Sequence, residues 1–176
     1  MARGIRPSTT QSTVALWAKS ALDTLLFFAL CMIVLPWLAN WLLPQPVPLP
    51  FWPRALVGGV LVVTGITVWV TCLDVFSRRG RGTPFPLDAP RHLVTTGPFA
   101  VVRNPIIAAE AAVVWGIALY LSSLGVLLYA VLFSLAGHGA VVYLEEPELR
   151  QRFGEQYDAY CRRVPRWFPR SRRGIA

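Results

Sequence analysis

Four long apolar runs constrain the fold of this chain more than any other feature. They cover residues 21–43, 55–76, 106–121 and 125–144. In a helix that rises about 1.5 Å per residue, the first run reaches ~34 Å, which is enough to cross the hydrocarbon core of a bilayer. Because lipid offers no hydrogen-bond partners to an open backbone, each run is predicted to be a helix. The predicted fold class is therefore all-α, an integral membrane bundle of four transmembrane helices.

The connections between the runs divide the chain into three parts. Residues 44–54, PQPVPLPFWPR, contain too many prolines to continue a helix and predict a short interfacial loop. The last two runs are divided only at Ser122 and Ser123, which predicts a tight helical hairpin over residues 106–144. We therefore expect a tail at residues 1–20, a first helix pair at 21–76 and a core at 77–176 that contains the hairpin.

Basic residues predict the orientation of the bundle. The chain has 17 Lys and Arg against 9 Asp and Glu, a net charge of +8. With four spans, only Arg54 falls on one side of the membrane. The positive-inside rule then places both termini and the segment at residues 77–105 in the cytoplasm. No nucleic-acid motif accompanies the charge, so the expected partner is the lipid bilayer with its anionic headgroups.

The sequence has no pattern of metal ligands. Cys31, Cys72 and Cys161 fall singly, and no two histidines share metal-ligand spacing with acids or cysteines. A glycine-rich phosphate loop is also missing from the sequence. We therefore expect no metal ion and no nucleoside triphosphate, and we interpret the cysteines as packing residues.

After the last apolar run, charged and apolar residues are mixed. Within residues 147–160, Leu149, Phe153, Tyr157 and Tyr160 are four, four and three positions apart, which is the spacing of one helix face. This spacing predicts a C-terminal amphipathic helix that lies on the membrane surface. A helix packed on a soluble partner is the alternative. The two prolines and two aromatic residues of VPRWFP then predict an extended tail.

Polar residues flank the hairpin. Glu145 and Glu146 follow its second run, where a helix C-terminus disfavours negative charge, so they require a cation such as Arg103 or a positively charged ligand. Asn104 is a predicted N-cap and Pro105 a predicted first-turn residue of the hairpin. A helix N-terminus offers unpaired backbone N–H groups to a carboxylate, and Arg103 adds a forked donor.

Two ionisable residues, Glu110 and His138, lie inside the apolar runs. Such residues face other helices rather than lipid. We expect each to form a hydrogen bond between helices, with a Glu110–His138 pair across the hairpin as one candidate. A direct functional role within the membrane is the alternative.

The C-terminal half resembles a known family. It contains LVTTGPFAVVRNP at residues 93–105, then the hairpin, then LEEPELRQRFGEQYDAYCRRVPRWFP at residues 144–169. The order and spacing of RNP, EE, FGxxYxxY and VPRxxP are similar to those of the isoprenylcysteine carboxyl methyltransferase and phospholipid methyltransferase family of membrane enzymes. Its prokaryotic branch is the nearest match, which implies the prokaryotic inner membrane as the location.

The resemblance implies a cytoplasmic cofactor pocket that holds S-adenosyl-L-methionine, while a lipophilic acceptor arrives laterally from the bilayer. Arg103 and Glu146 are implied as the catalytic neighbours that orient cofactor or substrate, with Arg103 as a partner of the methionine carboxylate. The implied cofactor-binding residues are Arg91, His92, Leu93, Val94, Phe99, Asn104, Pro105, Ile106, Ile107 and Glu145.

The implied function is methyl transfer from S-adenosylmethionine to a lipidic or amphipathic small molecule at the cytoplasmic membrane face. Three positions depart from the family pattern. Phe99 replaces a common tyrosine, Ile107 replaces a small residue, and Val141 replaces the arginine that meets a prenylcysteine carboxylate. The first two favour the alternative of a non-catalytic membrane scaffold or binding protein that retains the fold. A small transporter is a third hypothesis, and the lack of inverted repeats disfavours it.

Overall fold

The computed structural model describes residues 22, 25–75 and 93–169, and the predicted N-terminal tail lies outside them. The described residues are helical apart from loops and an isolated β-bridge between Pro46 and Ser123, so the all-α prediction is confirmed for this part of the chain. In chain order the elements are η1 (Leu30–Val34), α2 (Leu35–Leu42), α3 (Phe51–Val75), η4 (Gly97–Ala100), α4 (Pro105–Leu121), α5 (Leu124–Ala140), η5 (Val141–Glu145), α6 (Glu146–Phe153) and α7 (Glu155–Arg163).

Three continuous helices are long and apolar enough to cross a membrane: Leu25–Leu42, Phe51–Val75 and Leu124–Phe153. The remaining apolar helix, α4, has 17 residues. At about 1.5 Å per residue this corresponds to ~25 Å, somewhat less than a hydrocarbon core of ~30 Å. The structure therefore gives three candidate membrane-spanning helices, and α4 as a fourth span stays a prediction.

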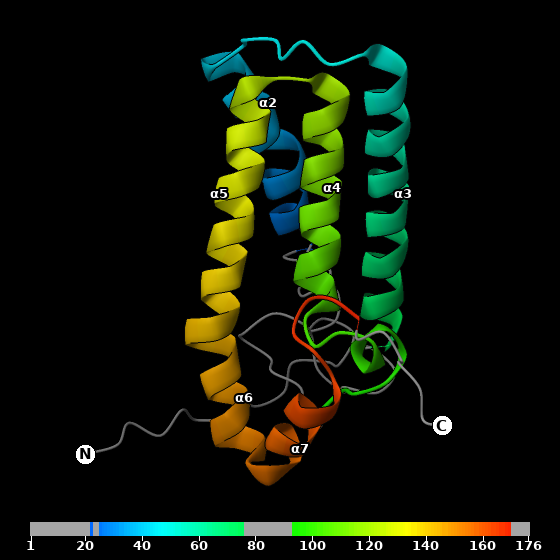
Figure 1. Ribbon diagram of the computed structural model, residues 1–176. Coiled ribbons are helices and arrows are strands. Elements are labelled where there is room, and N and C mark those ends of the chain that lie inside the picture. Colours follow the sequence, from blue (N-terminus) through cyan, green and yellow to red (C-terminus); the bar gives the residue numbers. More distant parts are fainter. Residues whose placement is uncertain (1–21, 23–24, 76–92, 170–176) are drawn as a thin grey trace, which may run out of the picture.

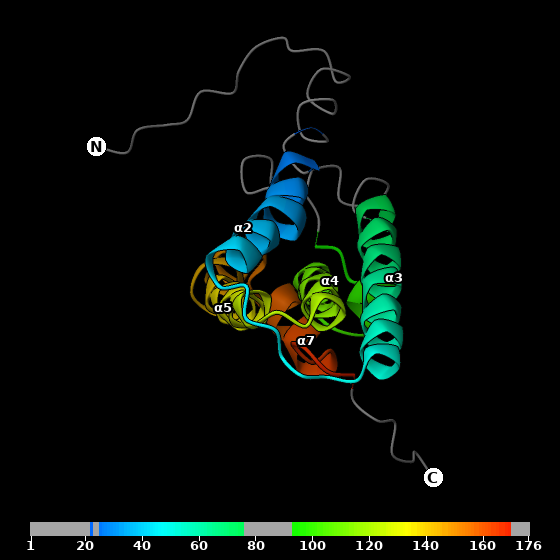
Figure 2. The ribbon, with the colours of Figure 1, turned by 90° about the horizontal axis from the view of Figure 1, so that it is seen from above.

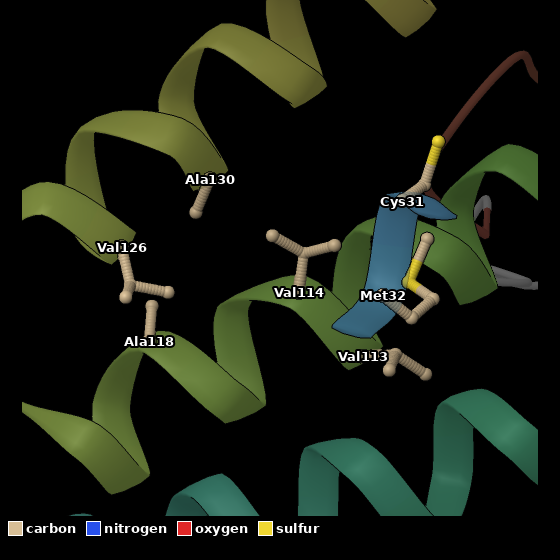
Figure 3. Close-up of a cluster of buried hydrophobic side chains, with 7 residues drawn as sticks. All are labelled: Cys31, Met32, Val113, Val114, Ala118, Val126 and Ala130. Atoms are coloured by element: carbon tan, nitrogen blue, oxygen red, sulfur yellow. The ribbon is translucent and has the colours of Figure 1, made fainter. Parts of the chain in front are cut away.

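Helix α4 lies at the centre of the bundle. Figures 1 and 2 show it between α3 and α5 and beside α2, with α7 below its N-terminal end. Its closest neighbour is α3, because glycines allow the two backbones to meet at Gly58 with Gly116 and at Gly65 with Ala109. On the side facing η1 and α5, buried side chains from all three elements form the main apolar core (Figure 3).

The predicted hairpin is confirmed at Ser122 and Ser123. Ser122 has a left-handed backbone (φ 53°), and α5 begins directly after Ser123. The Ser122 hydroxyl donates to the carbonyl of Val47 (2.7 Å), and the Val47 amide donates to the Ser122 carbonyl (2.7 Å). These bonds fasten the proline-rich loop to the hairpin and bring the first helix pair against α4 and α5.

Two widened π-helical turns allow helices to continue past prolines. The turns η1 and η5 each end two residues before a proline, Pro36 and Pro147. Proline has no backbone N–H and its ring crowds the preceding turn, so a widened turn at this point relieves the conflict without ending the helix. As a result, the helix that begins at Leu124 runs on to Phe153 instead of ending at residue 144 as the sequence analysis expected.

The predicted helix at residues 147–160 is instead two helices. Gly154, with φ 50°, separates α6 from α7 and reverses the chain direction (Figure 1). Positive φ is readily adopted by glycine, which explains why the break falls here. The reversal folds α7 back toward the N-terminal end of α4.

The predicted hydrogen bond between Glu110 and His138 is wrong, because each residue bonds to another partner. The buried Glu110 carboxylate accepts a hydrogen bond from the Trp69 indole of α3 (3.2 Å). His138 lies on α5, where its Nδ1 accepts from the Trp167 indole (3.1 Å). The expected hydrogen bond between helices is confirmed for Glu110, which the close glycine contacts of α3 and α4 turn toward α3, whereas His138 bonds to the C-terminal tail and not to a helix.

Candidate functional site

A pocket lies where the N-terminal end of α4 meets η5, α6 and α7. Three segments that are far apart in the sequence form its walls: the loop before α4, the end of the long helix that starts at Leu124, and α7. Its lining consists of Leu93, Val94, Phe99, Arg103, Asn104, Glu145, Leu149, Phe153, Tyr157 and Tyr160.

The loop before α4 is fixed by apolar packing and by one strong hydrogen bond. Val94 and Phe99 are buried against Cys72 near the end of α3. Gly97 adopts a left-handed φ of 64° close to Val75, which turns the chain into η4. The Tyr160 hydroxyl donates to the carbonyl of Phe99 (2.6 Å), so α7 holds this loop from the other side.

Arg103 is the central cation of the pocket. Its Nη2 lies 3.3 Å from Oε1 of Glu146, and its Nη1 contacts the sulfur of Cys161. Its Nε is buried and has no hydrogen-bond partner among the described residues. Because an unpaired buried donor is costly, this atom is a candidate contact for an anionic ligand group.

Glu146 anchors the C-terminal tail. The Arg166 guanidinium donates to both of its carboxylate oxygens, at 2.6 and 2.9 Å, and this hydrogen bond raises the pKa of Arg166. The Arg103 amide also donates to the Pro165 carbonyl (2.8 Å), and the Asn104 side chain donates to the Arg166 carbonyl (3.4 Å). Residues 164–168, here called the tail strap, are thereby held across the start of α4.

The apolar stripe Leu149, Phe153, Tyr157 and Tyr160 lines the pocket. The helical spacing of the stripe predicted a helix on the membrane surface, so these four residues were not among the predicted pocket residues. Burial raises the pKa of both tyrosines, which stay neutral and can donate hydrogen bonds. The FGxxYxxY pattern was the available signal, because it joins this stripe to the glycine that folds α7 back.

The structure brings together six of the residues implied by the resemblance: Leu93, Val94, Phe99, Arg103, Asn104 and Glu145 line the pocket. The other implied residues that the structure describes do not line the pocket. Ile106 packs against the Phe99 cluster, and Ile107 lies against Gly137 of α5. Pro105 is buried at the first turn of α4, and Glu146 is buried in its ion pairs. Arg91 and His92 fall outside the described residues.

Asn104 precedes α4 as predicted, with Pro105 at its first position. Its side chain does not cap the helix, because its amide donates to the tail strap instead. The predicted pairing of Arg103 with the glutamates is confirmed for Glu146. Glu145 is left facing the pocket.

Replacing Tyr160 with phenylalanine is expected to loosen the loop before α4. The variant would remove the hydrogen bond from α7 to the buried Phe99 carbonyl, which costs about 1–3 kcal/mol. Hydrogen exchange of the backbone amides of residues 97–102 should therefore accelerate, by roughly tenfold or more. Tyr143→Phe is the matched control, because Tyr143 is 78% exposed. Equal exchange in the two variants would contradict this role of the hydroxyl.

Within the described ranges, no three His, Cys, Asp or Glu residues gather in a way that could hold a metal ion. The charged side chains at the pocket are Arg103 and Glu145, on an otherwise largely aromatic and aliphatic lining. This combination suits an organic ligand that carries both charges together with a flat apolar part.

Comparison with known proteins places this pocket in a family context. The family model described as phospholipid methyltransferase matches residues 53–156, more than half of the chain. The match runs from the start of α3 through the hairpin and α6 into the start of α7. No curated protein matches the chain. Because this match covers more than half of the chain, the chain belongs to the phospholipid methyltransferase family and is a membrane methyltransferase by family.

Proposed function

We propose that the protein transfers a methyl group from S-adenosylmethionine to a lipidic or amphipathic small molecule at the cytoplasmic face of the membrane. One observation carries the proposal: a chain of a methyltransferase family folds so that Arg103 and Glu145, from two segments far apart in the sequence, line one pocket. The first comes from the loop before α4, and the second from the end of η5. The cofactor offers a carboxylate and cationic groups to such a pair.

The pocket residues divide by chemistry. Arg103 already balances Glu146, and its unpaired Nε, together with the helix N-terminus beside it, favours the carboxylate of the methionine part. Glu145 offers an acceptor to the cofactor's ammonium or ribose hydroxyl groups. Phe153 and Tyr157 provide flat apolar surface for the adenine ring.

The chemistry requires alignment more than acid–base catalysis. When bound, the cofactor would supply an activated methyl group for in-line transfer from its sulfur to a lone pair of the acceptor. The chain's own residues hold the cofactor in line with the acceptor and exclude water. Helix α7, which forms one wall of the pocket, serves that purpose.

The membrane arrangement follows from the same proposal. Helix α4 would be a short fourth span, since it runs antiparallel to α3 and is packed along it. Basic residues gather at the end of the bundle that holds the pocket, including Arg103, Arg150 and Arg166. By the positive-inside rule this end is cytoplasmic, and α7 lies near the headgroups. The resemblance of the sequence favours a prokaryotic inner membrane.

The test is calorimetric titration of S-adenosylmethionine into the detergent-purified protein and into Glu145→Gln. The substitution keeps the size of the side chain and removes a charged acceptor, so affinity should fall by about 10- to 100-fold. Glu155→Gln is the matched control, since Glu155 is exposed on α7 and does not line the pocket.

Equal affinity of Glu145→Gln and wild type for S-adenosylmethionine would show that Glu145 does not contribute to cofactor binding. No binding to folded wild-type protein would reject the proposal and favour the non-catalytic scaffold instead. Methyl transfer is then measured by incorporation of labelled methyl groups into extracted membrane lipids.

A further inference from the structure

A cluster of three charged side chains, Arg103, Glu146 and Arg166, lies beside the pocket and carries one more positive charge than negative. Its carboxylate, Glu146, is buried with 6% exposure and pairs with both guanidinium groups. Of the three residues, Arg103 lines the pocket, whereas Glu146 and Arg166 do not. A ligand in the pocket therefore meets this cluster through Arg103.

The two guanidinium groups share the carboxylate unequally. Arg166 donates from Nε to Oε1 of Glu146 (2.6 Å) and from Nη2 to Oε2 (2.9 Å), which is a bidentate geometry. Nη2 of Arg103 lies at the longer distance of 3.3 Å from Oε1, an oxygen that already accepts from Arg166. Arg166 thus takes the larger share of Glu146, and Arg103 keeps part of its charge for a ligand.

The remaining surroundings of the Arg103 guanidinium leave that charge in place. Its Nη1 contacts the sulfur of Cys161, and its Nε has no hydrogen-bond partner in the described part of the chain. Its side chain is 11% exposed, so little water solvates the charge. A buried charge that is only partly paired is costly, and an anionic group in the pocket would relieve this cost.

Arg166 also sets the charge balance around the ligand. With Arg166 present, two guanidinium groups balance the carboxylates of Glu145 and Glu146. This balance suits the methionine part of the cofactor, which carries one carboxylate and one ammonium group. Without Arg166, two carboxylates would surround Arg103, and the site would disfavour the carboxylate of a ligand.

The tail strap has attachments that do not involve the Arg166 side chain. The Arg103 amide donates to the carbonyl of Pro165 (2.8 Å), and the Trp167 indole donates to Nδ1 of His138 (3.1 Å). A substitution of the Arg166 side chain leaves these bonds available. It therefore changes the charge of the cluster while the strap stays in contact with α4 and α5.

We propose that Arg166 is a positioning residue for the cofactor: by holding Glu146, it leaves the charge of Arg103 available to the cofactor's carboxylate. Arg166 acts through Glu146 and does not itself touch the ligand. The result is selectivity for ligands that carry a carboxylate over analogues that lack it. This inference rests on the proposed function, since it assumes that S-adenosylmethionine occupies the pocket.

The experiment titrates two ligands into the full-length detergent-purified protein: S-adenosylmethionine and its decarboxylated form, which lacks only the carboxylate. Wild type should bind S-adenosylmethionine at least tenfold more tightly than the decarboxylated form. Arg166→Gln should bind S-adenosylmethionine about tenfold more weakly than wild type does. Its affinity for the decarboxylated form should be unchanged or higher, because the site becomes more negative.

Two further variants separate charge from structure. Arg166→Lys keeps the positive charge but loses the forked geometry, so its selectivity should stay within about threefold of wild type. Arg163→Gln is the matched control, since Arg163 is an exposed arginine of α7 and does not line the pocket. It should bind both ligands as wild type does.

Three results would overturn the inference. Equal losses of affinity for both ligands in Arg166→Gln would show a purely structural role, and unchanged selectivity in that variant would show no role. Loss of selectivity in Arg166→Lys would show that charge is not the cause, and this variant decides the question if Arg166→Gln does not fold.

The wild-type titrations separate this inference from the proposed function. Equal affinity of wild type for the two ligands would overturn the inference, because the carboxylate would then contribute nothing, and would leave the proposed function standing. Wild-type protein that is folded and binds neither ligand would instead reject the proposed function itself.

Discussion

Glu146→Gln is expected to destabilise the protein by about 3 kcal/mol, because it leaves two guanidinium groups without their counter-charge. Arg103 is almost fully buried, with 11% of its side chain exposed, and within the described part of the chain Glu146 is the one carboxylate that pairs with it. The Arg166 side chain is 34% exposed and recovers part of its hydration when the pair breaks. The expected loss of stability is therefore at the lower end of the range for breaking a buried ion pair. For a chain of this size the midpoint of thermal unfolding should fall by about 6–12 °C.

The matched control is Glu148→Gln, two residues along the same helix. Glu148 pairs with Arg152 at 3.4 Å, with both side chains substantially exposed, and such pairs contribute less than about 1 kcal/mol. Thermal unfolding followed by circular dichroism in detergent compares the two variants directly. Similar midpoints for both would show that the ion pairs of Glu146 do not anchor the tail strap.

The Arg103–Glu146 pair is also the clearest success of reasoning from sequence. Two adjacent carboxylates near the end of an apolar helix required a cation, and the best candidate preceded the hairpin. Which of the two glutamates forms the pair could not be derived from the sequence. That choice depends on the π-helical turn η5, which changes the rotation of Glu145 and Glu146 about the helix axis.

The ends of the helices were harder to predict than the helices themselves. Length and hydropathy predicted the apolar helices and the hairpin, since these properties depend on local sequence. Pro147 looked like a boundary, but the widened turn before it lets the helix continue. Gly154 then provides the break, which was missed because the helical spacing of the apolar residues continues across this glycine and favoured a single helix.

Contacts between distant segments could not be derived from periodicity. The stripe of Leu149, Phe153, Tyr157 and Tyr160 was correct in its spacing, but spacing alone does not show what covers a face. The partner of Glu110 was missed for a similar reason. The glycines of α3 and α4 fix how the two helices meet, and this packing brings Trp69 within reach of the carboxylate.

That packing leads to the second large effect: Gly58→Leu should disrupt the contact between α3 and α4. A Cβ atom at Gly58 would lie 2.7 Å from the carbonyl oxygen of Gly116, and backbone cannot move aside as a flexible side chain can. Overpacking of this kind costs about 1–3 kcal/mol and sometimes more, and we expect the upper part of this range because whole helices must separate. The displaced α4 would also move Arg103 and Asn104, so cofactor affinity should fall with stability.

Gly59→Leu is the control that isolates the contact. Gly59 is the next residue of the same helix, and a Cβ there meets nothing within 4 Å. Leucine has a helix propensity better than that of glycine by up to about 1 kcal/mol, so this variant should be as stable as wild type or slightly more stable. Unfolding midpoints and cofactor titrations of the two variants form one experiment. Because both substitutions add the same side chain at adjacent positions of α3, equal losses would mean that added bulk alone is responsible and that α3 and α4 do not meet at Gly58. A loss confined to Gly58→Leu would show that close backbone contact between these helices supports the pocket at their end.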